Sequence, residues 1–411
     1  MSHPLCHFCG SPLENTFVDL GNTPLSNSYL KESDLSRPEP RYLLHAYVCS
    51  KCFLVNVEEF ESPAKIFSEY AYFSSYSDTW LKHCESYAGQ MVERFALNGE
   101  SRVIEIGSND GCLLRCFKNR GITVLGVEPA RNIATVAQSA GIQTIAEFFG
   151  TACAERQARE GRHADLLVAN NVLAHVPDLN DFVKGMKRIL KGSGVITIEF
   201  PHLLRLIEDC EFDTIYHEHF SYFSFGTAMQ VLESHGLAVF DIEEVDTHGG
   251  SLRVFARHRE NNEHAVGNRV AAMQKREKKF GLGRLELYTS FGRKVETLKA
   301  RLTALLKELK SRGKQIVGYG APAKGNTLLN YCGIGRDLLD YTVDRSPHKQ
   351  GLWLPGSRIP ILAPDRLRET KPDYVLILPW NIRDEIMQQI GYIREWGGQF
   401  IVPIPDVVIR K

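Results

Sequence analysis

The stretch Val103 to Gly111, which reads Val-Ile-Glu-Ile-Gly-Ser-Asn-Asp-Gly, decides the fold of this chain. Its first four residues favour a buried strand, and the glycines and small polar residues that follow favour a tight turn. Leu113, Leu114 and Phe117 then recur at helical spacing. The stretch therefore predicts a strand, a glycine turn and a helix. Gly107 lets a ligand approach the backbone, and the helix N-terminus offers free N–H groups.

A second apolar run, Thr123 to Val127, ends in Glu128. In doubly wound α/β sheets an acidic residue about twenty positions after the glycine turn binds the hydroxyls of a ribose. The pattern Glu-x-Gly-x-x-x-Gly is commoner in S-adenosylmethionine (SAM) methyltransferases than in dehydrogenases, whose turn is Gly-x-Gly-x-x-Gly. We therefore predict a Rossmann-like domain that binds SAM. The residues expected to bind this cofactor are Glu105, Gly107, Asn109, Asp110, Glu128 and Asn170.

The alternation of strands and helices continues to about residue 200. It predicts further strands from Leu166 to Ala169 and from Gly194 to Phe200. Asn170, Asn171 and His175 follow the first of these strands, at the edge where open α/β sheets bind ligands. We expect Asn171 to contact a substrate beside the cofactor.

The composition limits the class of protein. The 411 residues include 49 basic and 49 acidic side chains, which argues against a nucleic acid as the main ligand. The content of 43% hydrophobic and 24% charged residues is ordinary for a globular protein, and the length predicts two or three domains. No apolar run of about 18 residues and no signal peptide are present. We therefore expect a soluble cytoplasmic protein with no membrane partner.

Four of the ten cysteines form two Cys-x-x-Cys pairs, Cys6 with Cys9 and Cys49 with Cys52. Each pair can present two thiolates to one face of a tetrahedral ion, and such pairs in an intracellular chain are typical of zinc. Four thiolates leave no position open for water, so we predict a structural zinc site. The alternative is two unrelated thiol pairs in a reducing compartment.

A segment after residue 212 is dense in groups that can handle a proton. Two histidines flank a carboxylate and two tyrosines bracket them, a combination that favours a catalytic site over structural histidines. An extended segment would point residues 217 and 219 one way and 216 and 218 the other, whereas a helix would splay all four. The sequence leaves open which of them face the site. The residues are Tyr216, His217, Glu218, His219 and Tyr222.

Two other segments flank these motifs. Glu69 to Trp80 carries an aromatic cluster, which either packs on the domain or forms a lid over the cofactor. Residues 264–312 are charged and helical with a stripe of leucines. This pattern predicts a helical arm that covers its own domain rather than a second subunit.

A second strand, glycine turn and helix begin at Gln315 and run through Gly318 to Gly325. Lys324 stands where it could meet a phosphate at the start of the helix. The next strand, Leu339 to Val343, ends in Asp344. The glycine pattern by itself suggests a dinucleotide site. Because the first glycine turn already accounts for the cofactor, we expect this second turn to bind the substrate instead. The residues expected to bind substrate are Asn171, Tyr222, Gly320, Ala321, Lys324 and Asp344.

Several of these stretches, in the same order, resemble the SAM-dependent C-methyltransferases that act on nucleotide-linked 4-keto deoxysugars. The cysteine pairs resemble the amino-terminal zinc module of that family, Val103 to Gly111 with Glu128 resembles its SAM site, and Tyr216 to Tyr222 resembles its catalytic signature. His248 to Val254 and Gly318 to Asn326 resemble two further family stretches, the latter opening the domain that holds the nucleotide sugar. Five motifs in one order are highly specific, and the resemblance covers essentially the whole chain.

The resemblance implies the site and the domains. The proton-handling groups fall on Tyr216, Glu218 and His219, with His175 near the sugar and Tyr70 reaching in from the aromatic lid. We expect an α/β chain of four parts. They are a zinc module at 1–68, a SAM domain with the lid at 69–262, a helical connecting arm at 263–312 and an α/β nucleotide-sugar domain at 313–411.

A 4-keto sugar would let the chain make a carbon nucleophile, because the neighbouring carbonyl delocalises the charge left by a removed proton. We hypothesise that His219 removes the proton, that Tyr216 or His175 binds the enolate oxygen, and that Glu218 orients a histidine. The product would serve the biosynthesis of a deoxysugar for an antibiotic or a surface polysaccharide. The alternatives are an O- or N-methyltransferase, a non-catalytic nucleotide-sugar binding protein or a nucleic-acid modifying or binding protein. The nucleotide (dTDP, GDP or another), the methylated carbon (C-3 or C-5) and the oligomeric state (monomer or homodimer) stay open.

Overall fold

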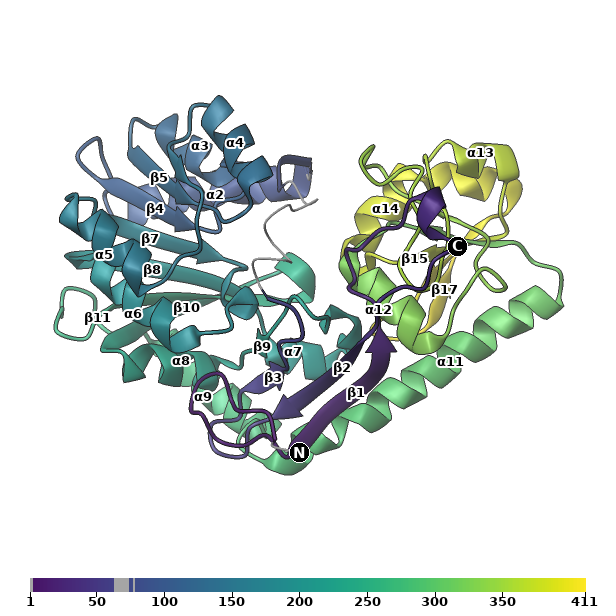
Figure 1. Cartoon of the computed structure of the whole chain (residues 1–411), viewed down its shortest axis with the longest axis horizontal. Coiled ribbons are helices and arrows are strands. Elements are labelled where there is room, and N and C mark those ends of the chain that lie inside the picture. The colour runs from purple at the N-terminus through teal and green to yellow at the C-terminus, as the bar shows by residue number, and fades with distance from the viewer. Residues whose placement is uncertain (1–2, 63–73, 77) are drawn as a thin grey trace.

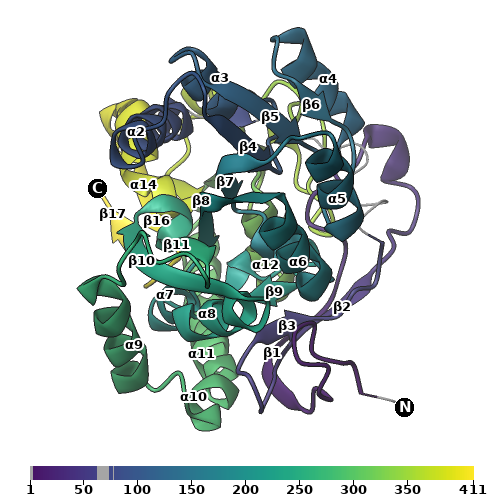
Figure 2. The same ribbon diagram turned by 90° about the vertical axis from the view of Figure 1, so that its left-hand side faces the viewer.

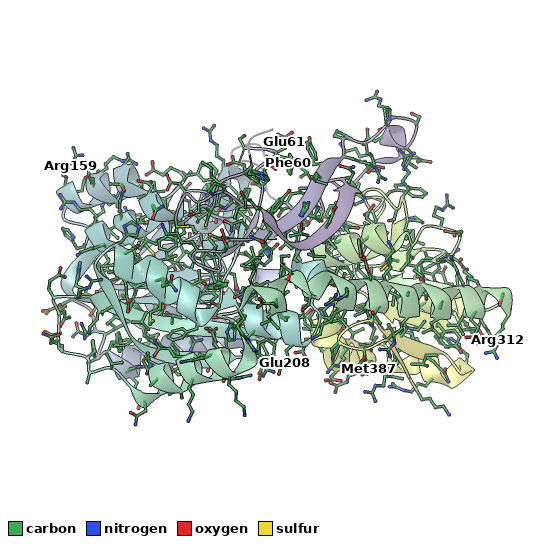
Figure 3. All side chains as sticks on the ribbon, turned by 90° about the horizontal axis from the view of Figure 1, so that it is seen from below. Phe60, Glu61, Arg159, Glu208, Arg312 and Met387 are labelled. Carbon is green, nitrogen blue, oxygen red and sulfur yellow. The ribbon has the colours of Figure 1, made fainter. Side chains whose placement is uncertain are left out.

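A computed structural model of the 411-residue chain describes residues 3–62, 74–76 and 78–411. Three β-sheets, of four, seven and six strands, organise these residues. In Figure 1 the seven-stranded sheet forms the left lobe and the six-stranded sheet the right lobe. Viewed from below, Arg159 and Arg312 mark opposite ends of the molecule, the latter just after the long helix α11 (Phe291–Ser311) (Figure 3).

The seven-stranded sheet has the order β10-β11-β8-β7-β4-β5-β6, and β11 is antiparallel to both of its neighbours. The strand β4 pairs in parallel with β5 on one side and β7 on the other, so the chain order reverses there. Ligands bind at such a reversal, beyond the carboxyl ends of the strands. The strands are β4 (Arg102–Ile106), β5 (Thr123–Val127), β6 (Thr144–Ile145), β7 (Ala164–Asn170), β8 (Leu190–Pro201), β10 (Leu237–Val245) and β11 (Ser251–His258). The prediction of a Rossmann-like domain is confirmed.

Helices cover both faces of this sheet, as Figure 2 shows end-on. Successive side chains of a strand point to opposite faces. In β4, Val103 packs with α2 and α3, whereas Ile104 and Ile106 belong to the core under α6 and α8. The helices are α2 (Asp78–Arg94), α3 (Cys112–Lys118), α4 (Arg131–Ser139), α5 (Thr151–Arg159), α6 (Leu179–Ile189), α7 (Leu203–Glu208) and α8 (Phe225–Ser234).

The amino-terminal sheet is antiparallel and has the order β1-β2-β3-β9. Its last strand comes from the segment that carries the proton-handling groups. The four-stranded sheet thus ties the cysteine pairs to that segment. The strands are β1 (Asn15–Thr23), β2 (Tyr42–Val48), β3 (Val55–Val57) and β9 (Ser221–Tyr222).

The carboxy-terminal sheet has the order β14-β13-β12-β15-β16-β17 and is parallel except for β17. The apolar face of α11, including Leu298, Leu302 and Leu306, is buried in a core that this sheet shares with the amino-terminal sheet. The helical arm therefore packs on its own chain. The elements are β12 (Ile316–Tyr319), β13 (Thr342–Val343), β14 (Ile361–Leu362), β15 (Tyr374–Ile377), β16 (Gln399–Val402), β17 (Val408–Arg410), α9 (Asn268–Phe280), α10 (Leu285–Thr289), α12 (Ala323–Cys332), α13 (Arg366–Thr370) and α14 (Arg383–Gln389). No helix in the described part of the chain is long and apolar enough to cross a membrane.

Candidate active site and zinc site

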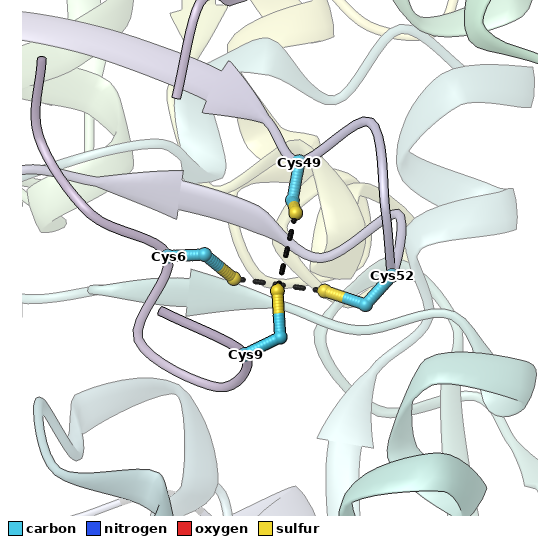
Figure 4. Close-up of side chains that lie close together, drawn as sticks. All are labelled: Cys6, Cys9, Cys49 and Cys52. Carbon is cyan, nitrogen blue, oxygen red and sulfur yellow. Dashed lines mark hydrogen bonds between the residues drawn. The ribbon is translucent and has the colours of Figure 1, made fainter. Parts of the chain in front are cut away.

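The four cysteines of the two Cys-x-x-Cys pairs converge (Figure 4). The Sγ atoms of Cys6 and Cys52 are 3.6 Å apart and those of Cys9 and Cys49 are 3.5 Å apart. A tetrahedral zinc ion with Zn–S bonds of about 2.3 Å needs sulfur atoms roughly 3.8 Å apart. All four sulfurs lie within 4.8 Å of one another. The donor set and spacing fit zinc held by four thiolates, which leaves no position for a substrate.

One cavity of about 720 Å³ joins the three sheets. Its lining includes the turn after β4, the segment from residue 214 to 219, and the start of α12. It also includes Asn27 and Tyr29, from the loop that follows β1. The turn after β4, the proton-handling groups and the second glycine turn therefore meet at a single cavity.

The turn after β4 is shaped for a ligand. Gly107 has φ +65°, and a Cβ there would lie 2.5 Å from Cγ2 of Val172, so a side chain does not fit. Glu128 accepts hydrogen bonds from the backbone N–H groups of Asn109 and Ala130, each at 2.9 Å, which fixes its carboxylate at the cavity wall. Burial raises the pKa of Glu128, although these two N–H groups oppose the shift.

Several buried polar atoms at this turn make no hydrogen bond within the described chain. They are Oε2 of Glu105, Oγ of Ser108, Oδ1 of Asp110 and both side-chain polar atoms of Asn170. Buried polar groups in folded proteins are almost always paired, so these atoms are available to a polar ligand. Their number and their position beside Glu128 fit the polar groups of SAM.

Residues 216–219 form a tight turn, in which the N–H of His219 donates to the carbonyl oxygen of Tyr216 at 2.9 Å. The first and fourth residues of such a turn lie close together. The rings of Tyr216 and His219 are consequently 4.1 Å apart, and Tyr216 Oη lies 2.7 Å from His219 Nε2. This is neither of the two conformations that the sequence suggested, and it pairs residues 216 and 219. His217 points instead toward the carbonyl oxygen of Leu43.

The hydrogen bonds fix the roles of the two nitrogen atoms of His219. Nδ1 lies 3.0 Å from the carbonyl oxygen of Thr214, which can only accept, so Nδ1 carries a proton. In the neutral ring Nε2 is then the acceptor, and Tyr216 donates to it. The hydroxyl of Tyr222 holds the same turn, because it accepts from Tyr216 N at 3.3 Å and donates to Thr214 O at 3.4 Å.

His175 and Glu218 complete this cluster from two sides. Nδ1 of His175 donates to the backbone carbonyl oxygen of Glu218 at 2.7 Å. The Glu218 carboxylate accepts from Nδ2 of Asn27 at 2.8 and 2.9 Å. Glu218 therefore contacts His175 through its main-chain carbonyl group. The carboxylate of Glu218 faces Asn27 in the loop after β1.

Burial keeps the imidazoles of the cavity neutral. It lowers the pKa of His175 to about 4 and that of His219 well below its usual value, and the nearby His175 adds to the shift of His219. Burial, with the positive charge of Lys324, also lowers the pKa of His248 to about 4. A neutral imidazole can accept a proton at its free nitrogen, or donate a hydrogen bond from its N–H, near pH 7 without first losing a proton.

The turn after β12 has its backbone groups paired within the chain. Ala321 N donates to Asp344 Oδ2 at 2.7 Å, and Ala321 O accepts from Tyr29 Oη at 2.6 Å and from Lys349 Nζ at 2.8 Å. Gly320, with φ +89°, could not carry a Cβ, which would lie 2.6 Å from Pro379. Gly320, Ala321 and Asp344 thus shape this edge of the cavity without lining it.

Lys324 and Lys349 are the cations of this edge and both line the cavity. Lys324 Nζ bonds Asn381 Oδ1 and lies 4.2 Å from the centre of the Trp380 ring. Burial lowers its pKa, and the nearby Asp213 and Glu211 oppose that shift. The positive charge of Lys324 is therefore balanced by carboxyl groups of the other lobe.

The cavity gathers most of the predicted site residues. Those that line it are Glu105, Gly107, Asn109, Glu128, Asn170, Asn171, His175, Tyr216, His219 and Lys324. Those that do not line it are Asp110, Glu218, Tyr222, Gly320, Ala321 and Asp344. Tyr70 lies outside the described residues, as does part of the predicted aromatic lid.

The residues of the cavity wall that sequence reasoning did not assign to the site include Asn27, Tyr29, Phe148, His248 and Lys349. Lys349 carried a signal, because it follows Asp344 at the carboxyl edge of the second sheet. Nothing in the sequence connects Asn27 with Glu218, which is 191 positions away.

Three family models match the chain. Residues 6–67 match the "Putative zinc binding domain", residues 80–242 a methyltransferase domain and residues 246–405 a C-methyltransferase C-terminal domain. The chain is 37% identical over 401 residues to C-methyltransferase NovU of Streptomyces niveus, which covers 98% of this chain and 95% of that protein. It is 30% identical over 98 residues to a ubiquinone biosynthesis O-methyltransferase of Bartonella tribocorum, 24% of this chain and 40% of that protein. Magnesium protoporphyrin IX methyltransferase of Synechocystis with bound SAM aligns with 43% of this chain and 78% of its own, at 14% identity and a TM-score of 0.33.

Proposed function

Because the chain belongs to the C-methyltransferase family and is a SAM-dependent C-methyltransferase, we propose that its substrate is a nucleotide-linked 4-keto deoxysugar. SAM and a structural zinc ion are its cofactors. The same proposal covers a cytoplasmic role in deoxysugar biosynthesis and the division of the chain at residues 68, 262 and 312.

The observation that carries this proposal is the single cavity between the two glycine turns. One turn offers unpaired polar atoms beside Glu128, as a nucleoside cofactor requires. The other places Lys324 at the start of α12, and Nζ of Lys349 reaches the same turn from the loop after β13, so two cations stand where a diphosphate requires them. Tyr216 and His219 lie on the wall between them, so a sugar linked to the diphosphate would reach the proton-handling pair.

We assign the removal of the substrate proton to the pair of Tyr216 and His219. His219 Nε2 is the accepting nitrogen, and the hydroxyl of Tyr216 is its partner in the absence of substrate. The C–H bond beside the ketone breaks, its proton passes to His219, its electron pair forms the carbon–carbon double bond of the enolate, and the carbonyl π electrons move onto the keto oxygen. Bound SAM supplies an electrophilic methyl group for the carbon nucleophile that results.

The remaining predicted residues hold this pair in place under the proposal. Glu218 fixes His175 through its carbonyl oxygen and fixes the loop after β1 through Asn27. Tyr222 holds the backbone of the 216–219 turn. Zinc holds the cysteine pairs, whose sheet ends in β9, directly after that turn.

The first experiment incubates the protein with labelled SAM and a panel of 4-keto nucleotide sugars, and identifies each product by NMR. A new C–CH₃ group at C-3 or C-5 is the expected result. A methyl group on oxygen or nitrogen instead would overturn the proposal.

The second experiment uses His219→Asn. We expect turnover to fall by about 10²–10⁴-fold while SAM affinity stays unchanged, because a general base contributes about that factor. Exchange of the proton beside the ketone with deuterium from solvent should fall by the same factor. Unchanged exchange would remove His219 from the role.

A further inference from the structure

We propose that His248 is a further catalytic residue, which donates a hydrogen bond to the keto oxygen of the substrate as negative charge develops there. The inference rests on the proposed function, because it requires an enolate. His248 lies in the turn between β10 and β11, and this turn contributes to the cavity wall. The donor for the enolate oxygen would therefore come from this part of the wall.

The backbone of His248 is strained. It lies in a short 3₁₀ turn (Thr247–Gly249) with φ +57° and ψ +17°, a left-handed conformation that is uncommon for residues other than glycine, although histidine adopts it more often than most. The two residues that follow, Gly249 and Gly250, have φ +102° and +130°. Strain of this kind persists only where the surroundings impose it, and it is concentrated at functional sites.

The surroundings do impose the turn. A Cβ on Gly249 would lie 2.4 Å from Glu211 Oε1 and 2.8 Å from the Trp380 ring, and a Cβ on Gly250 would lie 2.8 Å from Arg205 Cγ. Trp380 belongs to the carboxy-terminal lobe, and its Nε1 donates to Asp213 of the other lobe at 2.8 Å. The turn is thus clamped where the two lobes meet, and the clamp sets the position of His248.

The ring of His248 faces the cavity. His248 lines the cavity, and the charged and polar groups that act on its ring are Lys324, Glu199, His83 and His175. Its nearest recorded ring neighbour is Trp80, at 6.4 Å between centroids. Across the described residues the structure records no hydrogen bond to either of its ring nitrogens, so the ring is available to a ligand.

The neighbouring groups of the cavity already have partners. His219 Nε2 accepts from Tyr216, and Nδ1 of His175 donates to Glu218 O. A neutral imidazole can donate its N–H to a developing oxyanion without supplying a proton to it. The low pKa of His248, which burial and Lys324 produce, keeps its ring in that neutral form. The pair of Tyr216 and His219 can then act as base while His248 acts as donor.

The electron count of the step is complete with these groups. The C–H bond breaks, its proton goes to His219, and its electron pair forms the carbon–carbon double bond of the enolate. The carbonyl π electrons move onto oxygen, where the N–H of His248 binds the charge. No proton passes from His248, so its ring does not have to be reprotonated between turnovers.

The test compares His248→Ala with His248→Asn. Asparagine tolerates left-handed backbone and keeps an N–H donor, whereas alanine has the same backbone demand without a donor. His235→Ala is the control, because His235 lies outside the cavity lining, bonded to Asn180. Each variant is assayed for SAM affinity, for kcat and KM, and for deuterium exchange at the substrate carbon with S-adenosylhomocysteine bound.

We expect His248→Ala to lower both kcat and the exchange rate by about 10²–10³-fold, as removal of one oxyanion donor does. SAM affinity should stay within twofold of the wild type, and His248→Asn should recover part of the loss. Exchange and kcat within threefold of the wild type in His248→Ala would overturn the assignment. So would a higher KM with unchanged exchange. If His248→Ala does not fold, His248→Asn alone carries the test. Because asparagine keeps an N–H donor, a loss of exchange in His248→Asn as large as that in His219→Asn would overturn the assignment of His248 as donor.

The wild-type protein separates this inference from the proposed function. If it gives neither exchange nor a C-methyl product with any 4-keto sugar, the proposed function fails and the role of His248 fails with it. If it gives both and His248→Ala does as well, only the role of His248 fails.

Discussion

Two glycine turns, after β4 and after β12, each join a strand to a helix at the carboxyl edge of a parallel sheet. After β4 the polar atoms of Glu105, Ser108 and Asp110 are buried and include atoms with no partner in the described chain. After β12, Ala321 has both its N–H and its carbonyl group bound by Asp344, Tyr29 and Lys349. The first turn thus keeps buried polar atoms available to a ligand, whereas the Ala321 backbone of the second turn is paired within the chain.

The difference between the two turns shows that a strand, glycine turn and helix do not by themselves specify a binding site. A strand, a glycine turn and a helix bring a backbone to a sheet edge, but the neighbouring segments decide whether its polar groups stay available. After β12, groups of the loop from β1 and of the loop after β13 pair with the backbone of the turn, and the charged side chains that line the cavity there are Lys324 and Lys349. Three predictions test this comparison.

The largest effect should come from adding one methyl group at each turn. Gly107→Ala would push Val172 at the cavity wall, and we expect SAM affinity to fall more than tenfold and stability to fall by about 1–3 kcal/mol. Gly320→Ala would press on Pro379 and should cost similar stability with SAM affinity unchanged. Calorimetric titration with SAM and thermal unfolding measure the two effects.

Gly121→Ala is the matched control for this pair. Gly121 has φ +76° but no atom within 4 Å of an added Cβ, so the variant carries only the backbone cost. Equal loss of SAM affinity in Gly107→Ala and Gly320→Ala would contradict the distinction between the two turns.

A smaller effect should follow from removing one polar side chain from each region. Asn170→Ala removes atoms that have no partner in the described chain, so we expect SAM affinity to fall about 5- to 100-fold with little loss of stability. Asp344→Ala leaves the N–H groups of Ala321 and Ser346 without their acceptor and should cost about 1–3 kcal/mol, with SAM affinity unchanged. The opposite pattern in titration and unfolding would reverse the assignment of the two turns.

The smallest effect concerns pH. Burial raises the pKa of Glu128, so its carboxylate takes up a proton at a higher pH than usual. The protonated carboxyl group should then accept a weaker hydrogen bond from a hydroxyl group of SAM. SAM affinity should therefore fall by up to about tenfold per pH unit as pH drops below that raised pKa. Glu128→Gln should bind SAM more weakly and without this slope.

Lys349 supplies the contrast at the second turn. Burial acts to lower its pKa, but Tyr29 and Asp344 outweigh burial and the pKa is raised. Lys349 thus stays charged through neutral pH, so this lysine should add no slope to the affinity for the nucleotide sugar over the range in which SAM affinity falls. A slope near pH 6 or pH 8 would come from Asp213 and Glu211 beside Lys324, whose pKa values burial raises to about 6 and about 8. A parallel fall of both affinities would show that one group, not two, controls the cavity.

The amino-acid sequence by itself determined the local units of this protein. Strand periodicity located β4, β5 and β7 to within a few residues, and the Cys-x-x-Cys spacing located the four zinc ligands, because both signals lie within short windows. Glu128 could be predicted from the sequence as well, since the geometry of one βαβ unit sets its distance from the glycine turn. The family resemblance supplied the proposed substrate class and the proposed role of the segment around His219.

Only the tertiary structure decided how these units meet. The 216–219 turn pairs Tyr216 with His219, because a tight turn rather than a helix or a strand forms there. Asn27 reaches Glu218 and His248 reaches the cavity wall through packing between segments far apart in the chain. Periodicity and spacing record the neighbours of a residue along the chain, whereas these contacts depend on how three sheets pack around one cavity. That packing determined which polar groups were paired and which remained available to a ligand.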